Sequence, residues 1–131
     1  MHRSRLTGLL FDVPDEVSAA ETSFWSAALG RSPTPNEDGD DYEFFEGLFS
    51  GLQLMTQRIG GGASARVHVD IETDDVEAEV QRLERLGAVR VRAVESWWIM
   101  RDPAGLLFCV VRVQSPEEFA RSAITWDDHV I

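Results

Sequence analysis

Residues 97–111 read WWIMRDPAGLLFCVV, two apolar runs on either side of Asp102-Pro103-Ala104-Gly105. Proline presets φ for the second position of a turn, aspartate can accept hydrogen bonds from the backbone just beyond it, and glycine tolerates a positive φ. The flanking runs are rich in aromatic and branched residues, as strands are. This stretch therefore predicts a β-hairpin, the last of the fold, and its second strand carries Cys109, the only cysteine.

Length and composition indicate one domain over residues 1–131, because 44% of the residues are hydrophobic and can form a core. The formal net charge of −11 disfavours nucleic acid and anionic membrane as partners, since both bind basic surfaces. A single cysteine excludes an internal disulfide and fits the reducing cytoplasm. No apolar run reaches the roughly 20 residues that a spanning helix needs. The expectation is a cytoplasmic protein without a membrane segment.

The first half of the chain predicts one helix, over 18–29. Ser18 and Glu21 have the spacing of a capping box, in which each side chain bonds the backbone at the other's position. Gly30 can adopt the left-handed conformation that ends a helix. One apolar face of this helix is expected to be buried, with Trp25 at its edge, and contains Ala20, Phe24 and Ala27.

The second half begins with a strand over 66–71, in which small apolar and polar residues alternate. Alternation predicts one buried face (Val67, Val69, Ile71) and one polar face (Arg66, His68, Asp70). A helix follows, capped by Asp74 with Glu77 at its third position and ended by Gly87. Its apolar stripe consists of Val76, Val80 and Leu83, with Leu86 close by.

The same element order occurs twice, which indicates an internal repeat. Each half has a strand, a helix ending in Leu-Gly, and three further strands; Asp12 corresponds to Asp70. The first module covers about 6–57, with a strand over 6–13, a loop over 31–41 containing an edge strand near 34–37, and strands over 42–46 and 52–57. The second covers about 66–113, after a glycine linker at 60–64. A C-terminal tail over 114–131 starts with a short helical turn at 116–120.

Three stretches now carry a resemblance to a known family. They are FWSAALG at 24–30, HVDIETDDV at 68–76, and the DPAG turn at 102–105 with its following strand. In this order and spacing they resemble the glyoxalase/bleomycin-resistance/dioxygenase group, the vicinal oxygen chelate superfamily, and within it the glyoxalase-like subgroup. The resemblance implies an α+β fold of two tandem βαβββ modules that form a half-open barrel around a cavity. It also implies a homodimer.

The resemblance assigns the metal-ligand positions of this superfamily to residues of this chain, and only some of these residues can coordinate a metal. His68 occupies the position of a histidine ligand, and Cys109 that of a glutamate ligand. The corresponding first-strand position falls at Gly8, Leu9 or Leu10, whose side chains cannot coordinate a metal. Asp70 lies about 7 Å along the strand from His68. No bound metal or other cofactor is therefore expected. His2 and His129, in the terminal segments, are interpreted as incidental.

Two functions remain open at this point. The first is metal-independent binding of a small flat or apolar molecule, as in bleomycin-resistance proteins. A four-residue hairpin loop would place Trp98 opposite Cys109 and facing the cavity, whereas a one-residue slip would exchange Trp98 and Trp97. The expected ligand-binding residues are His68, Asp70, Arg66, Trp98, Met100, Leu107 and Cys109. The alternative is a metal-dependent lyase or dioxygenase that uses His68.

Overall fold

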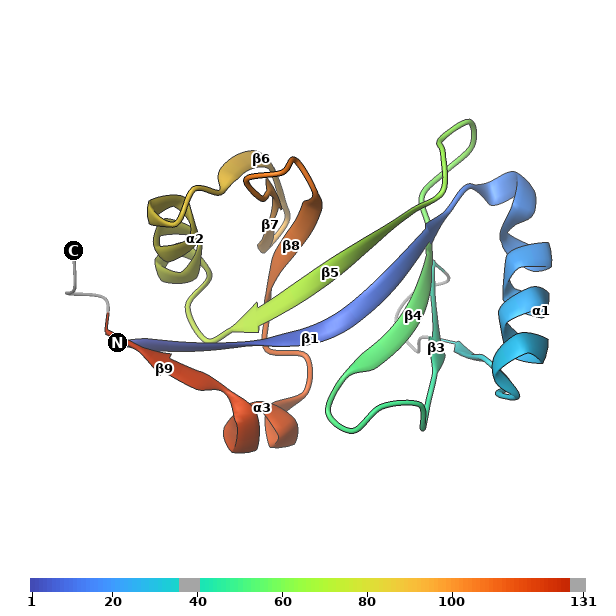
Figure 1. Cartoon of the computed structure of the whole chain (residues 1–131), viewed down its shortest axis with the longest axis horizontal. Coiled ribbons are helices and arrows are strands. Elements are labelled where there is room, and N and C mark those ends of the chain that lie inside the picture. The colour runs from blue at the N-terminus through green and yellow to red at the C-terminus, as the bar shows by residue number, and fades with distance from the viewer. Residues whose placement is uncertain (36–40, 128–131) are drawn as a thin grey trace. The chain divides into compact units, whose positions relative to one another are not determined.

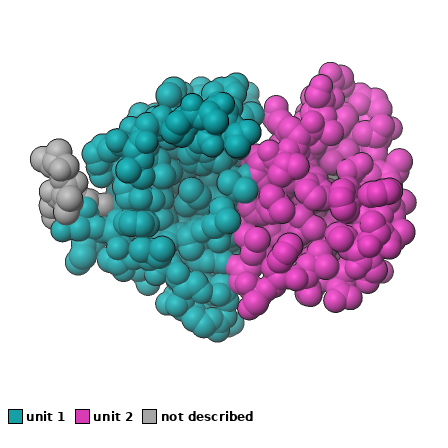
Figure 2. All heavy atoms as spheres, viewed as in Figure 1, with its two compact units in different colours: residues 1–7, 69–131 teal, residues 8–68 magenta. Residues whose placement is uncertain are grey.

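The computed structural model describes residues 1–35 and 41–127 (Figure 1). The predicted loop at 31–41 and the predicted tail both extend beyond these residues, and His129 lies outside them. The chain divides into two compact units, which Figure 2 shows in different colours. Unit 1 contains residues 1–7 and 69–131, and unit 2 contains residues 8–68. Strands β1 (His2–Val13) and β5 (Arg66–Thr73) each contain residues of both units.

Unit 2 is a sheet with one α-helix. Its strand order is β2-β3-β4-β1, and β1 pairs with β4 in parallel. The elements are β1 (His2–Val13), a 3-10 helix (Asp15–Val17), α1 (Ser18–Leu29), β2 (Thr34–Pro35), β3 (Tyr42–Phe45) and β4 (Gln53–Arg58). Strand β1 begins four residues before the predicted start, because His2–Ser4 pair with the C-terminal strand of unit 1.

Helix α1 differs from its prediction at its start and on its faces. Ser18 is the first helical residue and follows Val17 at the N-cap, where no side chain bonds the backbone. Glu21 instead accepts a hydrogen bond from Trp25 Nε1 at 2.7 Å. Trp25 packs against Phe11 of β1, with ring centroids 4.9 Å apart, whereas Phe24 is 60% exposed. The predicted face is wrong by about one residue: Ala20, Phe24 and Ala27 are exposed.

Unit 1 places α2 against a four-stranded sheet in the order β5-β8-β7-β6. The elements are β5 (Arg66–Thr73), α2 (Val76–Arg85), β6 (Val89–Val94), β7 (Trp97–Arg101), β8 (Leu107–Arg112), α3 (Pro116–Ser122) and β9 (Ile124–Trp126). Strand β9 pairs with the start of β1. The predicted tail therefore contains a helix and a strand that belong to this unit.

The core of unit 1 forms where α2 meets the sheet, and the predicted stripe of α2 is confirmed there. Val80 is fully buried, and Val76 and Leu83 pack against the same cluster. The cap lies one residue after the prediction, because Asp75 Oδ1 accepts the Ala78 N–H at 3.0 Å. Asp74 instead accepts hydrogen bonds from the Arg3 backbone and side chain. Leu86 is exposed.

The β7–β8 hairpin confirms the predicted turn chemistry. Asp102 Oδ1 accepts the N–H groups of Ala104 and Leu106 at 2.9 and 2.8 Å, and Gly105 has a φ of 91°. The Asp102 N–H also donates to Leu106 O at 2.9 Å, and Arg101 pairs with Leu107. The loop therefore contains five residues rather than the four assumed from the sequence.

The α+β class and the repeated βαβββ order are confirmed. The connection from β4 to β5 contains the glycine stretch, which is tied to the residues after β1. Asp15 N donates to Gly60 O at 3.0 Å, and Gly62 N donates to Glu16 Oε1 at 2.8 Å. Among the described residues, the helices are all too short or too polar to cross a membrane.

Candidate functional site

The sheet face of unit 1 that points away from α2 carries the polar residues of β5. Residues paired across neighbouring strands point to the same face, and their neighbours along the strand point to the other. Asp70 pairs with Cys109, and Cys109 pairs with Ile99, so these three share one face. Val69 and Phe108, each one residue earlier, point to the opposite face and belong to the core beside α2.

The register of the hairpin corrects the predicted strand faces of Trp98 and Met100. Trp98 pairs with Val110 and Met100 with Phe108, so both side chains point toward α2. Met100 is fully buried there and Trp98 packs against the same cluster. The cause is the extra loop residue, because a one-residue slip exchanges the two faces of a strand. Trp97 and Ile99 therefore replace them on the face of Cys109, which Leu107 shares as predicted.

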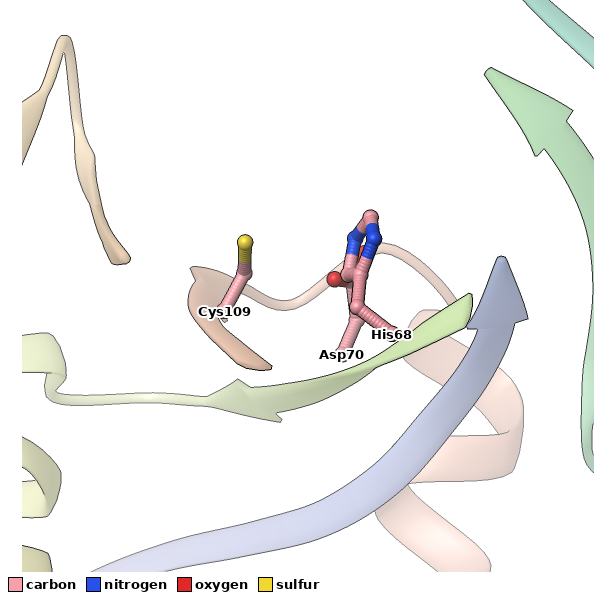
Figure 3. Close-up of side chains that lie close together, drawn as sticks. All are labelled: His68, Asp70 and Cys109. Atoms are coloured by element: carbon pink, nitrogen blue, oxygen red, sulfur yellow. The ribbon is translucent and has the colours of Figure 1, made fainter. Parts of the chain in front are cut away.

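His68, Asp70 and Cys109 form one close group (Figure 3). One ligand atom from each lies within 4.8 Å of the other two, and the side chains rise from the same side of β5 and β8. His68 and Asp70 are two residues apart on a single strand, and Asp70 is the β-partner of Cys109. The expected spacing of about 7 Å applies to the backbone positions along the strand, and the ligand atoms of the side chains lie closer together than that.

A buried aspartate on β1 fixes the His68 ring. His68 Nδ1 lies 2.7 Å from Asp12 Oδ2, and both side chains are buried. An ionised carboxylate only accepts hydrogen bonds, so Nδ1 carries the proton. Asp12 was absent from the predicted site residues. Its correspondence to Asp70 in the repeat was the signal that could have identified it.

Arg66 also binds this aspartate. Its Nε donates to Asp12 Oδ2 at 3.1 Å, and its side chain is half-exposed. Its neighbour Val67, predicted to be buried, is 56% exposed. On the predicted apolar face Val69 and Ile71 pack against the core, whereas His68 on the predicted polar face is buried, as is Glu72 farther along the strand.

The group of His68, Asp70 and Cys109 fits a divalent metal in its donor set. Zinc accepts imidazole, carboxylate and thiolate, and catalytic zinc sites have three protein ligands and one open position. A metal-binding histidine usually gives its other ring N–H to a carboxylate, as His68 does to Asp12. Leu10, one of the first-strand positions to which the resemblance assigns a ligand, is a buried apolar residue that cannot coordinate a metal.

Comparison with known structures finds the same fold in proteins of low sequence identity. Methylmalonyl-CoA epimerase from Mycobacterium tuberculosis has a TM-score of 0.59 and 16% identity, with 89% of this chain and 91% of that chain covered. A hypothetical protein from Bacillus halodurans has a TM-score of 0.62 and 14% identity, with 86% of this chain and 97% of that chain covered. Homoprotocatechuate 2,3-dioxygenase from Brevibacterium fuscum has a TM-score of 0.55 and 13% sequence identity. The match covers 84% of this chain but only 36% of that chain.

Curated protein sequences give no match. A family model described as "Glyoxalase-like domain" matches residues 9–111, which include both βαβββ modules almost completely. The structural neighbours have different activities, an epimerase and a dioxygenase, so the likeness to them concerns the fold. The chain belongs to the glyoxalase-like domain family.

Proposed function

We propose that this protein binds a small flat or apolar molecule, without a metal, on the face of β5, β8 and β7 that points away from α2. The observation that carries the proposal is the composition of this face. Trp97, Ile99 and Leu107 are half-buried there beside Cys109 and Asp70. Ligand pockets typically combine apolar and aromatic side chains with a few polar groups that orient the ligand. Half-buried apolar side chains on this sheet face offer such a surface.

The neutral planar probe 2-naphthamide tests this proposal. We expect saturation-transfer NMR signals from the naphthalene ring and an increase in melting temperature, because a ligand that binds only the folded state stabilises it. Trp97→Ala should weaken binding about tenfold, the loss of roughly 1.4 kcal/mol of contact. Phe24→Ala removes an exposed aromatic ring from α1 and serves as the matched control. Absence of saturation transfer, or equal weakening by both variants, would contradict the proposal.

The second candidate is a metal-dependent lyase or dioxygenase, and the close approach of His68, Asp70 and Cys109 favours it. In this alternative, these side chains would hold the metal and Asp12 would keep the His68 ring oriented. The metal would supply a Lewis acid for a substrate oxygen.

Calorimetric titration with zinc separates the two candidates. The metal-dependent alternative predicts about one zinc per chain, lost in Cys109→Ala and retained in Asp15→Asn, which removes an exposed carboxylate elsewhere. Metal-independent binding predicts no stoichiometric zinc and unchanged 2-naphthamide affinity in the presence of a chelator.

A further inference from the structure

Arg66 has most of its hydrogen-bonding capacity uncommitted. A guanidinium carries five N–H donors. Within residues 1–35 and 41–127, the only side-chain hydrogen bond of Arg66 is the one from Nε to Asp12 Oδ2 at 3.1 Å. The two terminal nitrogens, which carry the other four donors, belong to a side chain that is 52% exposed. The guanidinium group is therefore held at Nε, while its two terminal nitrogens are available to a ligand.

The partner that holds Arg66 is itself fixed. The Asp12 side chain is only 3% exposed, and the same Oδ2 atom receives the hydrogen bond from His68 Nδ1. Its second oxygen, Oδ1, is buried and has no hydrogen-bond partner among the described residues. A buried carboxylate with so few donors is costly unless a cation remains beside it. Asp12 therefore keeps Arg66 in place, which lowers the entropy lost when the arginine binds a ligand.

Other arginines of the chain differ from Arg66 in their surroundings. Arg90 is engaged by two carboxylates, through Glu77 and Glu84. Arg58 belongs to the same unit as Arg66, and its terminal Nη2 lies 3.5 Å from the exposed carboxylate of Asp41. Arg66 combines a buried anchor at Nε with terminal nitrogens that bond no other described residue.

We propose that Arg66 binds a carboxylate group of the ligand through its terminal N–H donors, with Asp12 as the positioning residue. The inference rests on the proposed small-molecule binding and names the ligand class as a planar carboxylate. Two parallel N–H groups of a guanidinium match the two oxygens of a carboxylate, a geometry that lysine does not offer.

The test compares 2-naphthoate with its neutral isostere 2-naphthamide on the full chain, by NMR titration. We expect 2-naphthoate to bind at least tenfold more tightly. The ratio of the two affinities should fall to about one in Arg66→Gln and remain unchanged in Arg58→Gln, which removes an equal charge from the same unit. In Arg66→Lys the ratio should be intermediate between those of wild type and Arg66→Gln, because lysine keeps the positive charge but lacks the two parallel N–H donors of a guanidinium.

Asp12→Asn tests whether Asp12 positions Arg66, because a positioning role and a purely electrostatic role predict opposite changes in 2-naphthoate affinity. If Asp12 acted only through its charge, its removal would strengthen 2-naphthoate binding. Positioning of Arg66 predicts the opposite, a lower ratio of naphthoate to naphthamide affinity. A wild-type ratio near one, or an unchanged ratio in Arg66→Gln, would overturn the inference while naphthamide binding still supported the proposed function. Absence of binding by either probe would overturn both.

Discussion

Glu79 lies on α2 with no exposed surface, and polar groups surround its carboxylate. Arg82 donates to both oxygens at 2.8 and 3.0 Å, and His2 Nε2 lies 2.7 Å from Oε1. Burial raises the pKa of Glu79, but hydrogen bonds from Arg82, His2 and Ser4 outweigh it, so the pKa lies below the ordinary value of 4.5. A carboxyl group whose pKa is lowered by folding stabilises the protein above its unfolded-state pKa.

Glu79→Gln should lower the free energy of unfolding at pH 7 by about 3 kcal/mol, because Arg82 and His2 lose a buried charged partner. The difference from wild type should decrease as the pH falls from 4.5 through the lower folded-state pKa, where Glu79 takes up a proton. Urea denaturation at pH 7 and at lower pH values measures this. Glu77→Gln is the control: its side chain is 54% exposed, so its loss should cost less than about 1 kcal/mol. A constant difference across this pH range would contradict the prediction.

At the level of elements, the two long helices start differently although both have a capping pattern in sequence. Asp75 caps α2 through its side chain, whereas Ser18 of α1 is already helical and follows a 3-10 turn. The residues before α1 lead directly from β1 into this turn, where Val17 N donates to Pro14 O. The incoming chain therefore determines which residue can serve as the cap.

Asp75→Ala should lower the free energy of unfolding by about 1 kcal/mol, the usual value of an N-cap hydrogen bond. Ser18→Ala should change it by less than about 0.5 kcal/mol, because its hydroxyl makes no capping bond. The midpoints of chemical denaturation compare the two variants directly. Equal losses in both would mean that Ser18 caps α1 in solution.

At the level of the whole molecule, the C-terminal elements are part of unit 1. Phe119 of α3 is buried, and the Arg82 guanidinium lies 3.8 Å from the centroid of the Trp126 ring. Trp126 Nε1 donates to Ser4 Oγ at 2.9 Å, beside the pairing of β9 with β1. These contacts join the C-terminal strand to the first strand and to α2.

Deletion of residues 116–131 should speed amide hydrogen exchange in the first residues of β1 and in α2, because it removes the partner strand and the buried Phe119 ring. Amides of β3 and β4 in unit 2 serve as the internal control and should keep their protection. Uniform loss of protection in both units would show that the deletion unfolds the whole chain. Unchanged exchange in β1 would contradict the structural role of β9.

We also expect a homodimer, from the family resemblance and from exposed apolar side chains such as Phe24 and Val17. Burial of such side chains between two copies would remove apolar surface from water. Sedimentation at micromolar concentration should give about twice the chain mass of 14.7 kDa. A single species at the chain mass would exclude this assembly under those conditions.

The sequence determined the chemistry of the hairpin turn, the apolar stripe of α2 and the repeated order of elements. Asp102, Pro103 and Gly105 predicted the hairpin turn because their conformational preferences belong to the residues themselves. The stripe of α2 was correct for a similar reason, since a 3.6-residue period specifies a face without reference to its partner. The repeated order of strands and helix then led to the family.

Only the tertiary structure decided which side chains meet. One additional loop residue moved Trp98 and Met100 into the core and placed Trp97 and Ile99 beside Cys109, because strand faces alternate with every residue. The contacts of Asp12 with His68 and Arg66 join positions 56 and 54 residues apart in the chain. No local pattern encodes such a contact, since strand pairing between distant segments sets it.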